Sequence, residues 1–158
     1  MGNKLDQEFL SQAIAIAIDN IRQGKGGPFG AVIVKDGKII ATGANYVTTQ
    51  NDPTAHAEIT AIRNACKALG SYQLTDCIIY SSCEPCPMCL GAIYWARPAK
   101  IVYASTRWDA ANAGFDDSLI YNEINIPIAK RKIPTVYIKI EETKKLFYEW
   151  GKMEKTEY

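Results

Sequence analysis

Two short motifs hold the residue types with which this sequence could do chemistry. They are His-Ala-Glu at 56–58 and Pro-Cys-Pro-Met-Cys at 85–89. One imidazole and two thiolates supply three protein ligands to Zn²⁺, which leaves its fourth tetrahedral site for water, as in catalytic zinc centres. Cys86 and Cys89 are three residues apart, so they share one face of a helical turn, and a helix N-terminus favours their thiolate forms. The pattern predicts a catalytic zinc site with His56, Cys86 and Cys89 as ligands.

Glu58 is expected to work beside this zinc without binding it. It follows His56 by two residues, so its side chain cannot easily leave a helix in the same direction, yet it stays near the metal. A carboxylate in such a place suits a general acid/base that exchanges protons with the water on the metal.

Other uses of the clustered cysteines explain the sequence less well. The three cysteines within residues 83–89 begin like a ferredoxin motif, but the fourth cysteine of that motif is missing. A thioredoxin-like redox pair leaves residues 56–58 without a role. A structural zinc would need Cys83 as its fourth ligand, because the chain has one histidine. The remaining cysteines are expected to be structural: Cys83 at a strand end, Cys66 and Cys77 in the core.

Composition describes an ordinary globular chain. Its 158 residues suit one domain, with 47% apolar and 22% charged residues. The net charge is +1, although residues 1–128 hold 10 basic and 12 acidic side chains and residues 129–158 hold 8 and 5. This balance weakens a function built on binding a long polyanion. An odd count of five cysteines, no targeting segment and no apolar run of about 20 residues favour a cytoplasmic protein without a membrane partner.

The elements that must hold the two motifs alternate between helix and strand. Periodicity predicts helices at 6–23, 54–69, 86–96, 118–123 and 142–153, and strands at 31–35, 38–42, 76–82, 100–105 and 134–140. Asp36-Gly37 predicts a hairpin between the first two strands, and the later crossovers are long enough for parallel pairing. Asp52 or Thr54 is expected to cap the second helix, and residues 106–117 to form a loop. The order predicts one α/β domain with helices on both faces of a mixed, five-stranded sheet.

With these residues in view, the chain resembles the cytidine deaminase-like superfamily, whose zinc enzymes carry H-x-E followed by P-C-x-x-C. The resemblance runs nearly end to end and is closest to the small bacterial guanine deaminases. It rests on GPFGAVIV at 27–34, NDPTAHAE at 51–58, SCEPCPMCLGAIYWA at 82–96, AGFDD at 113–117 and the C-terminal Tyr158.

The resemblance implies a three-layer α/β/α fold over residues 1–158 and one zinc ion per subunit. It implies hydrolytic deamination of guanine to xanthine and ammonia, a step of guanine catabolism, with Glu58 shuttling protons on the zinc-bound water. It also implies a homodimer in which residues 142–158 form a C-terminal helix and tail that swaps into the partner.

Six residues are implied as substrate contacts. Phe29 matches an aromatic residue that stacks on the purine, and Asn45 a base-contacting residue, while Asp117 faces the ring. Ala57 and Trp95 complete the pocket, and Tyr158 closes the site of the partner subunit. From the residues alone, Phe29 and Trp95 also suit a core, Asn45 a strand end and Asp117 a helix N-cap.

Three other functions stay open at this stage. A tRNA adenosine deaminase shares the zinc motifs, and the basic tail with Lys130, Arg131 and Lys132 could contact phosphates, although a solvated face is the favoured explanation of this tail. A guanosine deaminase needs room for a ribose near Tyr158. A non-catalytic zinc module would leave Glu58 and the open coordination position of the metal unused. This module is therefore not our main expectation, and neither is RNA binding.

Overall fold

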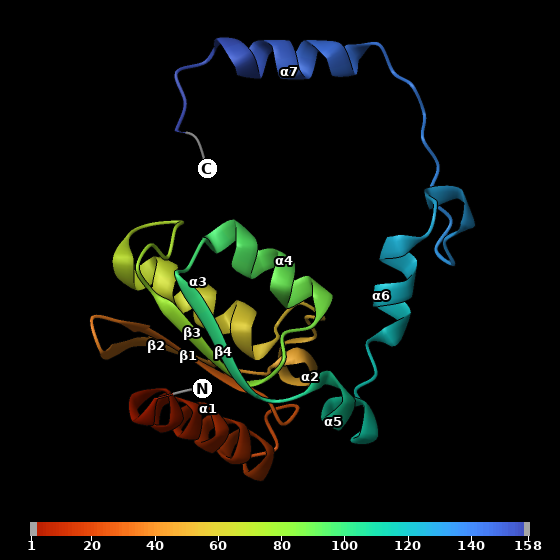
Figure 1. The fold of residues 1–158 in the computed structure, drawn as a ribbon. Coiled ribbons are helices and arrows are strands. Elements are labelled where there is room, and N and C mark those ends of the chain that lie inside the picture. Colours follow the sequence, from red (N-terminus) through yellow and green to blue (C-terminus); the bar gives the residue numbers. More distant parts are fainter. Residues whose placement is uncertain (1–2, 157–158) are drawn as a thin grey trace. The chain divides into compact units, whose positions relative to one another are not determined.

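A four-stranded sheet with the order β2-β1-β3-β4 lies at the centre of the first part of the chain (Figure 1). The computed structural model describes residues 3–156, which form two compact units that divide between residues 117 and 118. The strands are β1 (Gly30–Lys35), β2 (Lys38–Ala44), β3 (Ile78–Cys83) and β4 (Lys100–Ser105). The helices of the first unit are α1 (Lys4–Arg22), α2 (Val47–Gln50), α3 (Ala57–Leu69), α4 (Pro87–Ala96) and α5 (Arg107–Asn112).

Helices cover both faces of this sheet, as predicted (Figure 1). On one face, Phe9 and Ala13 of α1 pack in a buried cluster with Tyr80 of β3. On the opposite face, Ala61 of α3 and Ile93 of α4 belong to a second cluster that includes Ile79 of β3. Because neighbouring residues of a strand point to opposite faces, β3 contributes to both clusters. The α/β prediction with helices on both faces of a mixed sheet is therefore confirmed.

The hairpin prediction is also confirmed. β1 and β2 pair antiparallel, and both turn residues, Asp36 and Gly37, have positive φ values of 50° and 72°. Such turns match the twist of the strands that they join. β3 pairs antiparallel with β1 and parallel with β4, so β3 has a neighbour on each side. It is the strand from which the second motif departs.

The prediction of a fifth strand at residues 134–140 is wrong. Among the residues that the structure describes, the sheet has four strands. Residues 134–140 are irregular, and their apolar side chains are exposed, Tyr137 by 86%. They belong to the second unit, which holds α6 (Ser118–Asn125), the 3₁₀ turn η1 (Ile128–Lys130) and α7 (Glu142–Lys152). A strand needs a neighbour for its N–H and C=O groups, and this unit offers none among its described residues.

Two local predictions are corrected as well. α3 begins at Ala57 and not near residue 54, because the Asp52 carboxylate accepts hydrogen bonds from the N–H and hydroxyl of Thr54, at 2.8 and 2.7 Å, in a turn before the helix. The expected loop at 106–117 contains α5, which begins with reciprocal hydrogen bonds between Thr106 and Asp109. Short polar side chains near a helix start can cap it or compete with it, and their neighbours decide which.

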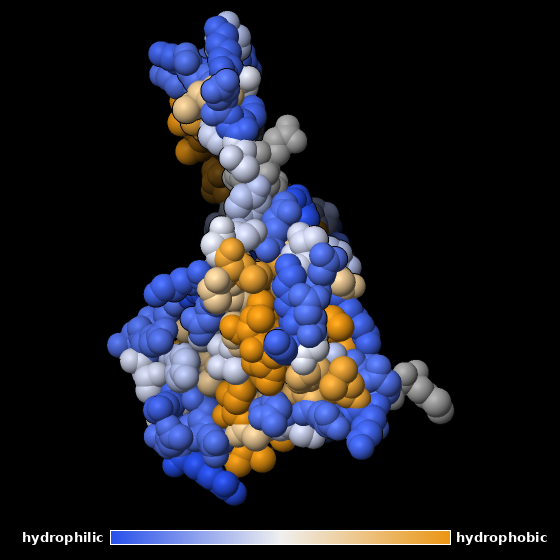
Figure 2. Space-filling view, turned by 90° about the vertical axis from the view of Figure 1, so that its left-hand side faces the viewer, coloured by the Kyte–Doolittle hydropathy of each residue, from blue (hydrophilic) through white to orange (hydrophobic). Residues whose placement is uncertain are grey.

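Apolar side chains remain exposed on both units. None of the helices in residues 3–156 is long and apolar enough to cross a membrane. The space-filling view shows a band of apolar surface between hydrophilic side chains (Figure 2). Large exposed apolar residues include Ile14, Ile18 and Ile21 of α1, Tyr94 and Trp95 of α4, and Leu146, Phe147 and Trp150 of α7.

Two strand glycines allow helices to approach the sheet closely. A Cβ atom at Gly30 would overlap the backbone of α1 at Ala13, and one at Gly43 would overlap the backbone of α3 at Ala57 and Ala61. Gly43 thus sets the distance between β2 and the first turn of α3, where the first motif lies.

We expect Gly43→Ala to lower the free energy of unfolding by about 1–3 kcal/mol, because the added methyl group overpacks this contact. It should also weaken zinc retention, since the start of α3 must shift. Thermal unfolding and metal analysis of the purified variant measure both effects. Gly91→Ala in α4 is the matched control, because no atom lies within 4 Å of its added Cβ and alanine favours the helix. Equal stability and zinc content in the two variants would contradict the prediction.

Candidate active site

The three predicted zinc ligands meet where α3 and α4 begin. His56 is the N-cap residue of α3, Cys86 is the N-cap residue of α4, and Cys89 lies one turn further along. Their ligand atoms all lie within 4.8 Å of one another, and His56 Nδ1 is 3.6 Å from Cys86 Sγ and 3.5 Å from Cys89 Sγ. In a tetrahedral zinc site, bond lengths of about 2.1 Å to nitrogen and 2.3 Å to sulfur place such atoms about 3.6 Å apart. The three residues therefore fit a zinc ion.

No other group of His, Cys, Asp and Glu comes together in this way within residues 3–156. Cys83, considered above as a fourth ligand, ends β3 with its Sγ 3.5 Å from the carbonyl oxygen of Thr106. Burial raises the pKa of Cys83 to about 11. Cys77 is fully buried, and Cys66 packs against the core, as predicted. The metal site thus has three protein ligands and leaves one tetrahedral corner for water.

One of the three ligands, Cys86, is held in the charge state that zinc binds. Hydrogen bonds, first from the Cys89 thiol and then with His56, lower the pKa of Cys86 to about 4. The same hydrogen bond to Cys86, together with burial, raises the pKa of Cys89. The hydrogen bond with Cys86 also raises the pKa of His56. Cys86 is therefore a thiolate at neutral pH, at a helix N-terminus that favours negative charge.

Glu58 lies beside the ligands, as the motif spacing indicates. Its side chain is 6% exposed, with Oε2 3.4 Å from Cys89 Sγ. Its Oε1 accepts a hydrogen bond of 3.2 Å from the Ser81 hydroxyl. Burial is the main cause that raises the pKa of Glu58. A buried carboxyl group with a raised pKa next to a metal ligand can both take and give a proton near neutral pH.

Asn45 lies just after β2, and the next residue bonds to the loop that enters α3. Its Oδ1 accepts hydrogen bonds from the backbone N–H groups of Gly27 and Val47, both at 3.3 Å, which sets the orientation of its amide. Asn20 of α1 donates from Nδ2 to the carbonyl oxygens of Asn45 and Gly27, at 2.8 and 2.9 Å. Asn45 Nδ2 has no hydrogen-bond partner among the described residues, so it is available to a ligand.

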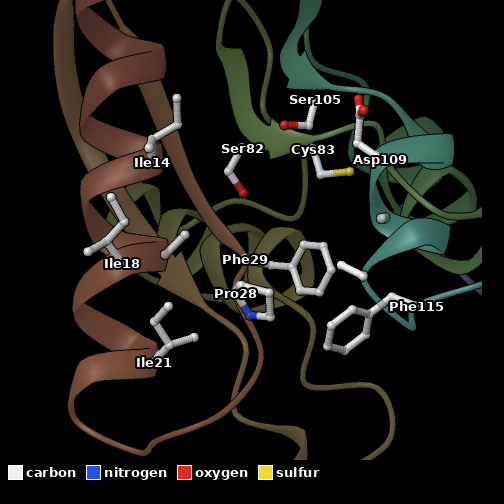
Figure 3. A pocket seen from close by; sticks show the side chains of 13 residues that line it. Ile14, Ile18, Ile21, Pro28, Phe29, Ser82, Cys83, Ser105, Asp109 and Phe115 are labelled. Atoms are coloured by element: carbon white, nitrogen blue, oxygen red, sulfur yellow. The ribbon is translucent and has the colours of Figure 1, made fainter.

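Phe29 lines a mainly apolar cavity of about 280 Å³ (Figure 3). The cavity lies between α1 and the segment from α5 to Phe115, with Cys83 at its wall. The rings of Phe29 and Phe115 meet edge to face, with their centroids 4.9 Å apart. No zinc ligand lines this cavity, so it is distinct from the metal site.

The remaining predicted substrate contacts differ in their placement. Burial, followed by the negative charge of Cys86, raises the pKa of Asp117, so this partly buried carboxylate lies within electrostatic reach of the zinc ligands. Ala57 is fully buried in the first turn of α3. Trp95 is 66% exposed on α4, about 9 Å along the helix axis from Cys89. Tyr158 lies outside the described residues. The roles of these residues toward substrate stay predictions.

Two residues that the sequence analysis did not single out contact the candidate site. Ser81 is 2% exposed and bonds to Glu58, and Asn20 is 4% exposed and bonds to the backbone of Asn45. A polar residue on the apolar side of a helix or strand is a signal that sequence can offer for such positions. Their partners come from other elements, however, and periodicity does not identify them.

Comparison with known proteins agrees with this geometry. The family model of the cytidine and deoxycytidylate deaminase zinc-binding region matches residues 3–105. This chain belongs to that deaminase family. The deaminase is 61% identical over 144 residues to a guanine deaminase of Bacillus subtilis. The aligned residues cover 91% of this chain and 92% of the relative. It is 35% identical to a tRNA-specific adenosine deaminase of Aquifex aeolicus, over 91% of this chain and 92% of that relative.

Solved structures support the same relationship. The crystal structure of the Bacillus subtilis guanine deaminase matches with a TM-score of 0.94 and 57% identity, over 99% of both chains. A guanine deaminase of Nitrosomonas europaea matches with a TM-score of 0.68 and 30% identity, over 74% of this chain and 66% of that one. The predicted resemblance to guanine deaminases is confirmed. The predicted zinc cofactor is confirmed by the family and by the three ligands that fit it.

We expect Cys86→Ala to reduce zinc from about one ion per chain to a trace after dialysis, because two protein ligands hold the ion far more weakly than three. Metal analysis by mass spectrometry measures the loss. Cys83→Ala is the matched control, since it removes a buried thiol from the same segment and should keep its zinc. A Cys86→Ala protein with full zinc content would remove Cys86 from the ligand set.

Proposed function

We propose that this deaminase converts guanine and water to xanthine and ammonia. The observation that carries the proposal is a buried Glu58 beside three residues that can bind zinc and leave its fourth coordination position open. It occurs in a chain that shares 61% identity with a guanine deaminase over nine-tenths of both proteins. The zinc site accounts for the reaction type, and the relationship accounts for the substrate.

In the proposed reaction, a C–O bond forms at the purine carbon that carries the amino group, and the C–N bond to that group breaks. His56, Cys86 and Cys89 would hold a zinc ion, which would lower the pKa of a bound water. Glu58 takes one proton from the water as it attacks and passes it to the adjacent ring nitrogen. It then takes the second proton from the new hydroxyl group and passes it to the amine, which leaves as ammonia. The raised pKa of Glu58 suits a group that must be base and acid in one cycle.

Three side chains are proposed to hold the base. Guanine has adjacent N–H donors on its ring nitrogen and amino group, and Asp117 offers a carboxylate that only accepts when ionised. Asn45 Nδ2 is available to donate to a purine acceptor, because backbone N–H groups already occupy its Oδ1. Phe29 is the proposed stacking residue, and its ring is steadied by Phe115.

Ammonia release from guanine, adenine, cytosine and guanosine tests the proposal. The zinc-loaded protein should convert guanine to xanthine, identified by mass, and turn over the other three compounds at least ~100-fold less efficiently. Glu58→Ala should keep its zinc and lose at least ~100-fold in kcat, because the proton carrier is gone. Turnover of guanosine in preference to guanine would move the assignment to the nucleoside. A zinc-loaded protein inactive on all four compounds would point to a base within RNA, where binding weakens steeply with salt.

We also propose that the protein is a homodimer in which residues 142–158 cross to the partner subunit. Two observations support this arrangement. In α7, the side chains of Leu146, Phe147 and Trp150 are 45–72% exposed. Large apolar side chains that are exposed together on one helix are typical of a surface that binds another protein chain. Trp95 of α4 is also exposed, by 66%. In the proposed dimer, Tyr158 of one chain closes the substrate site of the other.

Mixed dimers test the exchange of residues 142–158. Glu58→Ala and Tyr158→Ala chains, each with its own affinity tag, are co-expressed and purified through both tags. In a swapped dimer, the body with intact Glu58 receives the tail with intact Tyr158, so about half of the wild-type activity should return. In an unswapped dimer every site carries one defect, and activity should stay as low as in the parent variants. A monomer in sedimentation analysis would contradict the dimer itself.

A further inference from the structure

We propose that Ser81 is a positioning residue for catalysis: its hydroxyl holds one oxygen of Glu58, so that the other oxygen faces the zinc ligands and handles the protons. The proposal rests on the function assigned to Glu58 above. Its contribution is to name the group that sets the direction of that carboxylate.

The two oxygens of Glu58 have different surroundings. Oε1 accepts the 3.2 Å hydrogen bond from Ser81 Oγ, and Oε2 lies 3.4 Å from Cys89 Sγ. The last torsion of a glutamate is broad and nearly two-fold, so the side chain does not choose between its oxygens by itself. A contact from outside has to make that choice, and Ser81 supplies it for Oε1.

Ser81 is well suited to hold a fixed point. It belongs to β3, the central strand, and pairs with Ala31 of β1 on one side and Tyr103 of β4 on the other. Its side chain is 2% exposed and points to the same face of the sheet as Ile79, toward the apolar cluster beneath α3. A hydroxyl group in apolar surroundings costs free energy unless it is bonded, and its bond in this structure is to Glu58.

A hydroxyl group also fits the task chemically. It can donate to a carboxylate and, after rotation, accept from a carboxylic acid. Ser81 can therefore keep its contact with Glu58 before and after the carboxyl group takes up a proton. An ammonium or an amide N–H₂ group at this place could only donate.

Three variants test the proposal. Ser81→Ala should lower kcat for guanine about 10- to 100-fold, because a misdirected catalytic group loses most of its advantage. KM should change less than about two-fold, and zinc content should stay at about one ion per chain, since this hydroxyl bonds to Glu58 and Ser81 is not one of the metal ligands. Ser81→Thr keeps the hydroxyl and should restore kcat to within about three-fold of the wild type.

Ser82→Ala is the matched control. Ser82 is 7% exposed, and its side chain points to the face of the sheet opposite to that of Ser81. Its hydroxyl accepts a 3.1 Å hydrogen bond from the Gly30 N–H. Its loss should lower the thermal midpoint as much as Ser81→Ala does, while kcat stays near the wild-type value. Equal loss of kcat in both alanine variants, normal kcat in Ser81→Ala, or loss of zinc in Ser81→Ala would each overturn the positioning role.

The Glu58→Gln background separates this proposal from the one on which it rests. If Ser81 acts through Glu58, Ser81→Ala should change the residual kcat of Glu58→Gln by less than about two-fold. A further drop as large as in the wild-type background would overturn the inference about Ser81 alone. Full activity of Glu58→Gln itself would overturn the role of Glu58, and that of Ser81 with it.

Discussion

The chemistry of this protein depends on three ligand atoms from two different helices lying within 4.8 Å of one another. His56 and Cys86 each stand at the start of a helix, so the sheet must hold α3 and α4 on one face with their first turns together. Gly43 allows α3 to lie close on β2, and β3 leads directly into the segment that carries both cysteines. A shift of about 1 Å in either helix would spoil the tetrahedral set, which makes packing far from the metal part of the metal site.

Burial of Glu58 is the second constraint, and it opposes stability. A carboxylate that is 6% exposed loses most of its hydration, which raises its pKa and makes it useful as a proton carrier. The Ser81 hydroxyl offsets part of this cost at Oε1, and a zinc ion held by the neighbouring ligands would offset more of it. The environment that activates the group is therefore also the one that needs a dedicated hydrogen bond to keep it aligned.

The zinc site and the substrate site are separable in physical terms. This chain is related both to a guanine deaminase and to a tRNA-specific adenosine deaminase, so its membership of the zinc-binding deaminase family does not by itself select the base. Discrimination between purines has to come from hydrogen-bond donors and acceptors around the ring, since these distinguish guanine from adenine more strongly than shape does. Asn45 and Asp117, which lie outside both motifs, are the residues proposed for that task.

The sequence by itself determined most of the helices and strands of the first unit, the hairpin, and the three zinc ligands with the proposed proton carrier Glu58 beside them, because these depend on periodicity and on spacings of two or three residues. Only the tertiary structure decided which polar groups meet across elements: Ser81 with Glu58, and Asn20 with Asn45. It also decided against a strand at residues 134–140, whose pattern is typical of a strand, because backbone groups pair only where a neighbour exists. Local patterns follow from neighbours along the chain, whereas a hydrogen bond between distant segments depends on how the whole sheet and its helices pack.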